Sequence, residues 1–302
     1  MILENPQKFA IVGGDKRNIA LAEKLFRLGH EVRLFGFAES GLELPMQCKN
    51  LRETVLGARY IIGPTPCSLG GGALNAPFHN ASLHMEDLFR LMKTGQTLIA
   101  GFVKPEVKCL AVGHGIEIVD MLEREEMLVL NAIPTAEGAI KIAIEETDIT
   151  LHGNRVIVIG YGRIGTVLSR MLSGMGAKVS VVVNTSHAAA LAESAGHDVI
   201  CFRNMDNALP SATVIFNTVP EIILDEKNLP LVRKSTLLID LASAPNGVDA
   251  CAARTLGLKT LFANSLPGLV APVTTAEYIL ATVERIITNT ECISVTETEV
   301  ET

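Results

Sequence analysis

The 302-residue chain is 48% hydrophobic and carries a formal net charge of −7 at pH 7. Its length is typical of about two domains. An acidic chain without a basic, aromatic-interleaved stripe is not expected to bind nucleic acid. Since no apolar run approaches the ~18 residues of a membrane span and residues 1–8 lack the pattern of a secretory signal, we expect a cytoplasmic protein that is not membrane-bound.

The cysteines are scattered and form no C-x-x-C pair, which is typical of reduced thiols rather than of a disulfide or zinc framework. They are Cys48, Cys67, Cys109, Cys201, Cys251 and Cys292. His79 and His84 lie five residues apart, a spacing that does not put both imidazoles on one helical face. We therefore expect no metal site.

The first predicted unit is a strand, a glycine turn and a helix near the start of the chain. Residues 9–12 are an apolar run followed by Gly13-Gly14-Asp15, and a helix is expected over 18–28 before a strand at 32–36. The spacing is that of a dinucleotide fingerprint, but Asp15 stands at its second glycine position and Asn18 at its third. Because a carboxylate there would repel a phosphate, Asp15 is expected to be a helix N-cap or a functional acid.

Further strands are expected at 59–63, 97–102 and 128–131, and a linking helix at 136–147. They predict a smaller doubly wound domain in the first half of the chain.

An intact G-x-G-x-x-G occurs in mid-chain, directly after the apolar strand 155–159. Its glycines are Gly160, Gly162 and Gly165, and a helix over 164–172 and a strand over 178–183 complete a βαβ unit. In such a unit the first glycine makes the tight turn, the second admits the pyrophosphate, and the third lets helix and strand pack closely. The helix N-terminus then binds the anion. This context predicts a dinucleotide site.

The residues after the second strand of this unit bear on which dinucleotide binds. NAD sites usually have Asp or Glu here for the ribose diol, whereas this chain has Asn184-Thr185-Ser186. Small polar donors near the cationic Arg163 favour NADP. The alternative is that Asn184 bonds the ribose of NAD while Arg163 lies on the solvent face.

Three more strands are expected at 212–217, 236–239 and 260–262, and a helix at 276–287. Polar or Pro/Gly-rich segments follow these strands, at the edge where open parallel sheets bind ligands. The full predicted cofactor-binding set is Gly160, Gly162, Arg163, Ile164, Gly165, Asn184, Thr185, Ser186, Asn217, Thr218, Pro220, Asp240, Ala242, Pro267 and Gly268.

The predicted fold class is α/β, with two doubly wound Rossmann-like domains of which the second binds the dinucleotide. The first, substrate-binding domain is expected over 1–134 plus 273–302, because the last helix is expected to pack back on it. A linking helix is expected over 135–150, and the NAD(P)-binding domain over 151–272.

The motifs taken together resemble the family of the dipicolinate synthase A subunit, found in spore-forming bacteria. They follow one another in a single order over nearly the whole chain. The resemblance is carried by Gly13-Gly14-Asp15-x-Arg17, Asn131-x-Ile133-Pro134-Thr135-x-Glu137-Gly138, the intact glycine turn, Asn217-Thr218-x-Pro220, Asp240-Leu241-Ala242-Ser243 and Leu266-Pro267-Gly268-x-Val270-Ala271-Pro272.

The resemblance implies an NADP-dependent oxidation of 4-hydroxytetrahydrodipicolinate, or of dihydrodipicolinate, to pyridine-2,6-dicarboxylate during sporulation. It also implies a flavoprotein-like partner, the B subunit of dipicolinate synthase, and a location in the mother-cell cytoplasm. Asn184-Thr185-Ser186 departs from the more basic cluster expected for NADP.

A substrate with two carboxylates needs cationic or N–H donors and a proton acceptor. Arg17 is the leading candidate for a bidentate clamp, although it could be a surface arginine on a first helical turn. Glu137 is a candidate proton acceptor, or else the cap of the linking helix. Thr135 and Ser243 are candidate carboxylate donors.

Two other functions remain open from the sequence. One is a dehydrogenase of the alanine or 2-hydroxyacid type, although no His follows His197 and no Lys follows Lys259 to act as its acid–base. The other is a non-catalytic protein that binds the nucleotide and organises its partner. For such folds a homo-oligomer would be ordinary.

Overall fold

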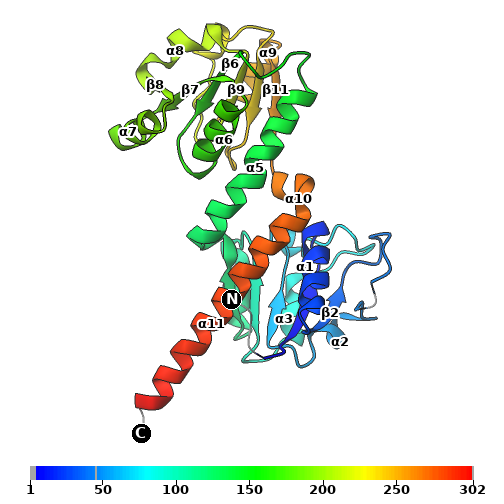
Figure 1. Ribbon diagram of the computed structural model, residues 1–302. Coiled ribbons are helices and arrows are strands. Elements are labelled where there is room, and N and C mark those ends of the chain that lie inside the picture. Colours follow the sequence, from blue (N-terminus) through cyan, green and yellow to red (C-terminus); the bar gives the residue numbers. More distant parts are fainter. Residues whose placement is uncertain (1–4, 45, 301–302) are drawn as a thin grey trace. The chain divides into compact units, whose positions relative to one another are not determined.

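The computed structural model describes residues 5–44 and 46–300, with side chains up to Thr288. The chain forms two compact units (Figure 1). The first unit combines residues up to Leu128 with those from Pro272 onward, and the second is Val129–Ala271. The predicted class of two doubly wound α/β domains is confirmed.

The sheet of the first unit is parallel with the order β2-β1-β3-β4-β5. Phe9 of β1 pairs with Val32 of β2 and with Tyr60 of β3. The strands are β1 (Lys8–Val12), β2 (Glu31–Phe35), β3 (Tyr60–Ile62), β4 (Thr97–Ala100) and β5 (Glu117–Asp120). The helices are α1 (Lys16–Arg27), α2 (Leu51–Val55), α3 (Met85–Leu91) and α4 (Pro105–Gly113), with short 3-10 turns η1 (Gly70–Gly72) and η2 (Met121–Glu123).

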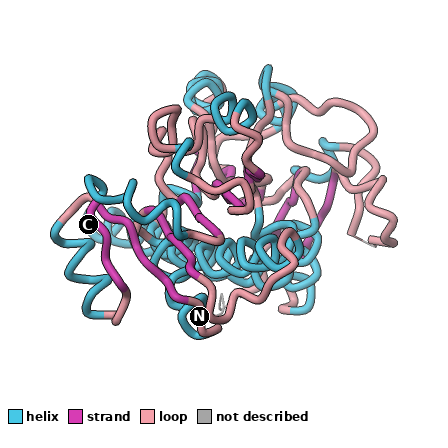
Figure 2. The backbone as a smooth tube through the Cα atoms, turned by 90° about the horizontal axis from the view of Figure 1, so that it is seen from above, coloured by secondary structure: helices cyan, strands magenta, loops and turns pink. Residues whose placement is uncertain are grey.

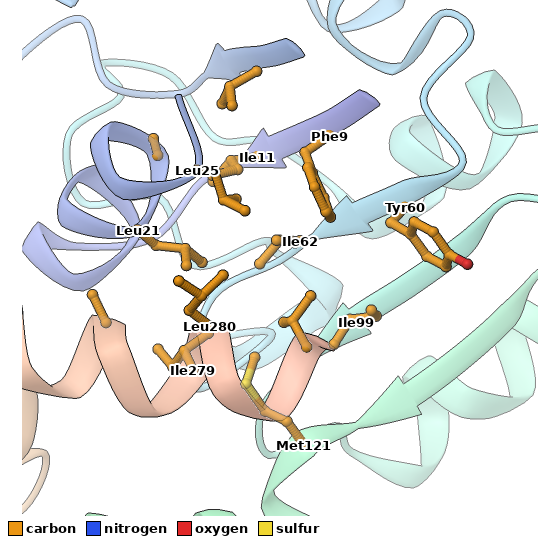
Figure 3. Close-up of a cluster of buried hydrophobic side chains, with 14 of the residues drawn as sticks. Phe9, Ile11, Leu21, Leu25, Tyr60, Ile62, Ile99, Met121, Ile279 and Leu280 are labelled. Carbon is orange, nitrogen blue, oxygen red and sulfur yellow. The ribbon is translucent and has the colours of Figure 1, made fainter. Parts of the chain in front are cut away.

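Helices cover both faces of this sheet, because its central strands are apolar on both sides. On one face, β1, β3 and β4 pack against α1 and the last helix, α11 (Pro272–Val300), as Figure 3 shows. On the other face, α2, α3 and α4 bury a second cluster. The predicted return of the C-terminal helix to the first domain is confirmed: α11 lies along α1, and Lys24 forms an ion pair with Glu277.

The sheet of the second unit is also parallel, with the order β11-β10-β9-β6-β7-β8. The strands of each sheet run alongside one another (Figure 2). The strands are β6 (Arg155–Ile159), β7 (Lys178–Val183), β8 (Asp198–Cys201), β9 (Val214–Asn217), β10 (Leu237–Asp240) and β11 (Lys259–Phe262). The helices are α6 (Arg163–Gly174), α7 (Ser186–Ser194), α8 (Met205–Ala208), α9 (Ala250–Thr255) and α10 (Leu266–Val270), with 3-10 turns η3 (Phe202–Asn204), η4 (Leu209–Ser211) and η5 (Leu229–Leu231).

Two sequence predictions for the middle of the chain are wrong. Residues 128–131 lie in a helix, α5 (Glu125–Glu145), and the fifth strand is instead β5. A short apolar run fits a strand or a helix equally well by periodicity, and here Glu125 and Glu126 occupy the first helical turn, where acidic side chains are favourable. The helix expected over 135–150 or 136–147 therefore begins about ten residues earlier, and the division between the units falls within it at 128/129.

Pro134 lies inside α5, where it cannot donate a backbone hydrogen bond. The helix continues because its buried side chains, among them Ala136, Ala139 and Ala143, pack in the core of the second unit. Among the described helices, α5 alone is long and apolar enough to cross a membrane by length and composition. Half of that apolar window is buried inside the protein, as in an ordinary core helix.

Candidate functional site

The glycine turn of the second unit has the geometry of a pyrophosphate cradle. Gly160 has φ of 93°, and a Cβ there would lie 2.5 Å from Thr218 Oγ1. A Cβ on Gly165 would lie 2.1 Å from the carbonyl oxygen of Gly160. A Cβ on Gly162 would meet nothing within 4 Å, and Gly162, as N-cap of α6, offers no side chain to the first helical turn. Two glycines thus permit close packing, and the middle one leaves open space over a helix N-terminus.

The ends of β9 and β10 are joined by a buried polar network. Asn217 Nδ2 donates to Asp240 Oδ1 (2.8 Å) and to the carbonyl of Val219 (2.9 Å). The Asp240 carboxylate also accepts the backbone N–H groups of Ala242 (3.1 Å), Gly247 (2.7 Å) and Val248 (3.0 Å). Asn217 and Asp240, both predicted to bind cofactor, therefore shape the loops at this edge with their side chains already engaged.

The other predicted cofactor-binding residues at this edge differ in burial and in hydrogen bonding. Thr218 donates through Oγ1 to the carbonyl of Ile159 (2.9 Å), which ties it to the glycine turn. Pro220 is exposed, whereas Ala242, Pro267 and Gly268 are buried. Arg163 is exposed and Ile164 half-buried in the first turn of α6.

A cavity of about 550 Å³ lies beyond the end of β7. Asn184, Thr185 and Ser186, which the sequence assigns to the ribose end of a dinucleotide, line it, and so does Arg203 of η3. Thr185 also caps α7, accepting the N–H of Ala188 (3.2 Å). Arg203 lies 17 residues after Ser186 and was missed, because only the folded sheet brings β8 and the turn that follows it beside β7.

In the first unit, the corresponding glycine turn is filled by side chains. Asp15 caps α1, accepting the N–H of Arg17 (2.9 Å), and its carboxylate also accepts Nε (2.9 Å) and Nη2 (2.8 Å) of Arg17. Arg17 Nη2 reaches the carbonyl of Thr65, and Asn18 Nδ2 donates to the carbonyl of Gly63 (3.2 Å). The guanidinium fork that the sequence assigns to a substrate carboxylate is thus bonded to Asp15, and Arg17 is buried rather than on the surface.

The remaining candidate catalytic residues lie in the second unit. Thr135 is buried, and its hydroxyl donates to the carbonyl of Asn131 (2.7 Å) beside the proline in α5. Glu137 is exposed in the interior of α5 and caps nothing, so the expectation that it begins a helix is wrong because α5 starts twelve residues earlier. Gly138 lets α5 approach α10, since a Cβ there would lie 3.0 Å from Leu266 Cβ. Ser243 is exposed in the loop after β10.

Among the described cysteines, only Cys67 has a thiol whose pKa is shifted from its ordinary value. Burial, together with the nearby Asp120 carboxylate, raises the pKa of the Cys67 thiol to about 12. The thiol is therefore neutral and not a nucleophile at physiological pH. The described residues contain no group of three or more His, Cys, Asp or Glu side chains that could hold a metal ion.

Comparison with known proteins first defines the class. Residues 135–261 match the family model "D-isomer specific 2-hydroxyacid dehydrogenase, NAD binding domain". L-alanine dehydrogenase shares the fold, with a TM-score of 0.65 at 13% identity over 93% of this chain and 89% of that one. The chain thus carries a nicotinamide-dinucleotide-binding domain of the dehydrogenase type.

The particular family follows from four further matches. Residues 8–122 match the family model of the N-terminal domain of the dipicolinate synthase A subunit. The dipicolinate synthase A subunit of Bacillus subtilis (strain 168) is 31% identical over 281 residues, which cover 91% of this chain and 94% of the relative. The crystal structures of the A subunits from Bacillus subtilis and Bacillus halodurans have TM-scores of 0.85 and 0.84, each at 28% identity. They cover 96% and 93% of this chain, and 99% and 97% of theirs. The chain belongs to the family of the dipicolinate synthase A subunit.

Proposed function

We propose that this protein is an NADP-dependent oxidoreductase that makes pyridine-2,6-dicarboxylate from dihydrodipicolinate or its hydrated precursor, 4-hydroxytetrahydrodipicolinate. The observation that carries the proposal is an open dinucleotide cradle at Gly162 within a chain of this family. The glycine turn at Gly160, Gly162 and Gly165 would hold NADP, which would supply the hydride acceptor for oxidation of a ring carbon of the substrate. Oxidation of dihydrodipicolinate also releases one proton, and 4-hydroxytetrahydrodipicolinate must first lose one water. Formation of an aromatic ring supplies most of the driving force.

NADP fits the residues beyond β7 better than NAD does. No carboxylate follows β7 in the sequence 184–186, where an NAD site usually carries one for the ribose diol. The Arg203 guanidinium lines the same cavity and forms no hydrogen bond or ion pair with the described residues. A 2′-phosphate would accept hydrogen bonds from Asn184, Ser186 and Arg203. Glu193 also lines this cavity, and its negative charge would repel the 2′-phosphate. We therefore attribute most of the preference for NADP to Arg203.

In this proposal the two units have different roles. The second unit holds the dinucleotide between the glycine turn and the loops after β9 and β10, and the first unit binds the dicarboxylate. Arg17 acts there by holding the loop after β3 through the Thr65 carbonyl. Glu137, exposed and without a side-chain partner among the described residues, takes up the released proton, and Ser243 donates to a carboxylate.

The proposed setting is the cytoplasm of the mother cell during sporulation. There the chain would act with the flavoprotein-like B subunit of dipicolinate synthase, and as a homo-oligomer. Copurification of the two proteins tests the partnership, and light scattering of the purified chain tests the oligomer.

The reaction is tested with the purified chain, NADP and enzymatically generated 4-hydroxytetrahydrodipicolinate. We expect the ultraviolet absorbance of pyridine-2,6-dicarboxylate to appear together with that of NADPH. Nucleotide binding without turnover, with or without the B subunit, would instead assign the chain a non-catalytic role. A strong preference for NAD would contradict the cofactor assignment.

Arg203→Gln tests the cofactor assignment directly. Loss of one charge-assisted contact should lower NADP affinity about tenfold and leave NAD affinity unchanged. Arg254→Gln, which removes an exposed arginine from α9, is the matched control and should change neither affinity.

A further inference from the structure

The loop after β4 holds a bulky residue in a strained conformation. Phe102 has φ of 53°, which side chains with a Cβ seldom adopt. The buried carboxylate of Asp120 enforces it, accepting the backbone N–H groups of Phe102 (2.9 Å) and Val103 (2.7 Å). Strain that the surrounding structure enforces in this way is concentrated at functional sites.

The side chains of this loop differ in their exposure to solvent. Phe102 is 54% exposed and makes no ring contact with the described residues, whereas Val103 beside it is buried. Lys104 is half-buried, and its ammonium forms no hydrogen bond or ion pair within the described chain. An aromatic face and a cation, two residues apart, are therefore both left available for a ligand.

The position of the loop in the sheet also favours a ligand. In the strand order β2-β1-β3-β4-β5, the usual ligand crevice lies between β1 and β3. Arg17 and Asn18 close that crevice by bonding to the loop after β3. The next pair of loops, after β3 and β4, is joined at Gly101, whose N–H donates to the Pro64 carbonyl (3.1 Å) and whose carbonyl accepts the N–H of Cys67 (2.7 Å). The approach is close, because a Cβ on Gly101 would lie 2.2 Å from Thr65 Oγ1.

We propose that Phe102 stacks on the ring of the dicarboxylate substrate and that Lys104 pairs with one of its carboxylates. The proposal rests on the proposed function and names two residues that recognise its substrate. Stacking on an aromatic face favours a flat ring, so Phe102 favours the ring as it becomes aromatic. An ammonium on the same loop provides a charge-assisted hydrogen bond.

The test measures binding of three probes to the full chain by titration calorimetry, with and without NADP. Pyridine-2,6-dicarboxylate is flat, piperidine-2,6-dicarboxylate has the same carboxylates on a saturated ring, and pyridine-2-carboxylate has only one carboxylate. The unmodified chain should prefer the first probe to both others.

Phe102→Gly removes the ring while supplying the residue that best tolerates a positive φ. We expect it to weaken binding of pyridine-2,6-dicarboxylate about three- to tenfold and to abolish the preference over the piperidine, with no fall in Tm. Phe102→Trp should retain the preference. Phe26→Leu, which alters a phenylalanine of α1 that is 57% exposed, is the matched control and should behave like the unmodified chain.

Lys104→Gln should weaken binding of pyridine-2,6-dicarboxylate about tenfold and bring it close to that of pyridine-2-carboxylate. Its control is Lys108→Gln, on the same helix, because Lys108 is already paired with Glu123 (2.5 Å).

Two results would overturn the proposal. One is an unchanged preference in Phe102→Gly while the unmodified chain binds pyridine-2,6-dicarboxylate. The other is a lower Tm in that variant, which would assign the ring to internal packing. If the unmodified chain binds none of the three probes, the proposed function itself fails, and this assignment fails with it.

Discussion

The two glycine turns of this chain begin alike and end differently. Each follows the first strand of its unit and leads into a twelve-residue helix. In the second unit the N-cap is Gly162, and the space above it is open. In the first unit the N-cap is Asp15, whose carboxylate caps the helix and binds Arg17. The residue at the N-cap therefore determines whether the helix end is filled by a carboxylate or left open.

A second contrast concerns the loops that follow the carboxyl ends of the strands in each unit. In each unit, a buried aspartate at the end of a strand accepts hydrogen bonds from backbone N–H groups of nearby loops. Asp240 at the end of β10 gathers three of them and the amide of Asn217, and Asp120 at the end of β5 gathers those of Phe102, Val103 and Leu122. Loop geometry in both units thus depends on a carboxylate outside the glycine turn.

The largest expected effect is that of Gly165→Ala in the intact turn. The new Cβ would lie 2.1 Å from a backbone oxygen that cannot move aside freely. We expect a loss of about 3 kcal/mol in the free energy of unfolding and at least a tenfold loss of NADP affinity. Chemical denaturation and nucleotide titration measure the two effects.

Gly174→Ala on the same helix is the matched control, because a Cβ there meets nothing within 4 Å. It should raise stability by about 0.5–1 kcal/mol through helix propensity. Equal behaviour of the two variants would show that the cradle does not depend on close packing at Gly165.

The next effect is that of Asp240→Asn. The substitution presents an amide NH₂ to backbone N–H donors, which leaves buried groups unsatisfied, and we expect a loss of about 2–3 kcal/mol together with weaker NADP binding. Asp120→Asn should lose about as much stability and leave NADP affinity unchanged. If both variants altered NADP binding equally, the assignment of the cofactor to the second unit would be contradicted.

Arg17→Ala should lower the free energy of unfolding by about 2 kcal/mol, because it removes the mostly buried cation that pairs with Asp15. The loss is limited because Asp15 is itself one-third exposed. Thermal denaturation measures the loss, and NADP affinity should not change. Arg27→Ala, at the exposed end of α1, should cost less than about 0.5 kcal/mol. A fully stable Arg17→Ala with a raised substrate KM would instead support a direct clamp.

The smallest effect is a dependence of stability on pH to which both units contribute. Burial lowers the pKa of His30 in the first unit and of His197 in the second below the ordinary value of 6.5. As the pH falls through 6.5, the unfolded chain takes up protons that the folded rings do not, so the free energy of unfolding decreases.

Denaturation at pH 7.5 and 5.5 should therefore show a smaller acid-induced loss in His30→Asn and in His197→Asn than in the unmodified chain. The double variant should show the smallest loss. An undiminished loss in the double variant would assign the acid sensitivity to other groups.

Much of the fold could be predicted because its signals are local. The intact glycine turn, the strand over 178–183 and the N-capping aspartate each depend on residues that adjoin in sequence. The run at 128–131 could not be decided, because its periodicity fits either structure and tertiary packing selects the helix. Arg203 and Phe102 were missed for a similar reason: neither belongs to a motif, and both reach the ligand edge only through the order of strands in a sheet.

By itself, the sequence determined the class of this protein, its two doubly wound units and the intact glycine turn, because strand periodicity and glycine spacing are patterns of a few neighbouring residues. Only the tertiary structure decided which side chains remain available beyond the strand ends of each unit. It bonded Arg17 to the Thr65 carbonyl and Asn217 to Asp240, while it left Arg203, Phe102 and Lys104 without partners among the described residues. Hydrogen bonds between residues distant in sequence make that selection, and no local pattern records them.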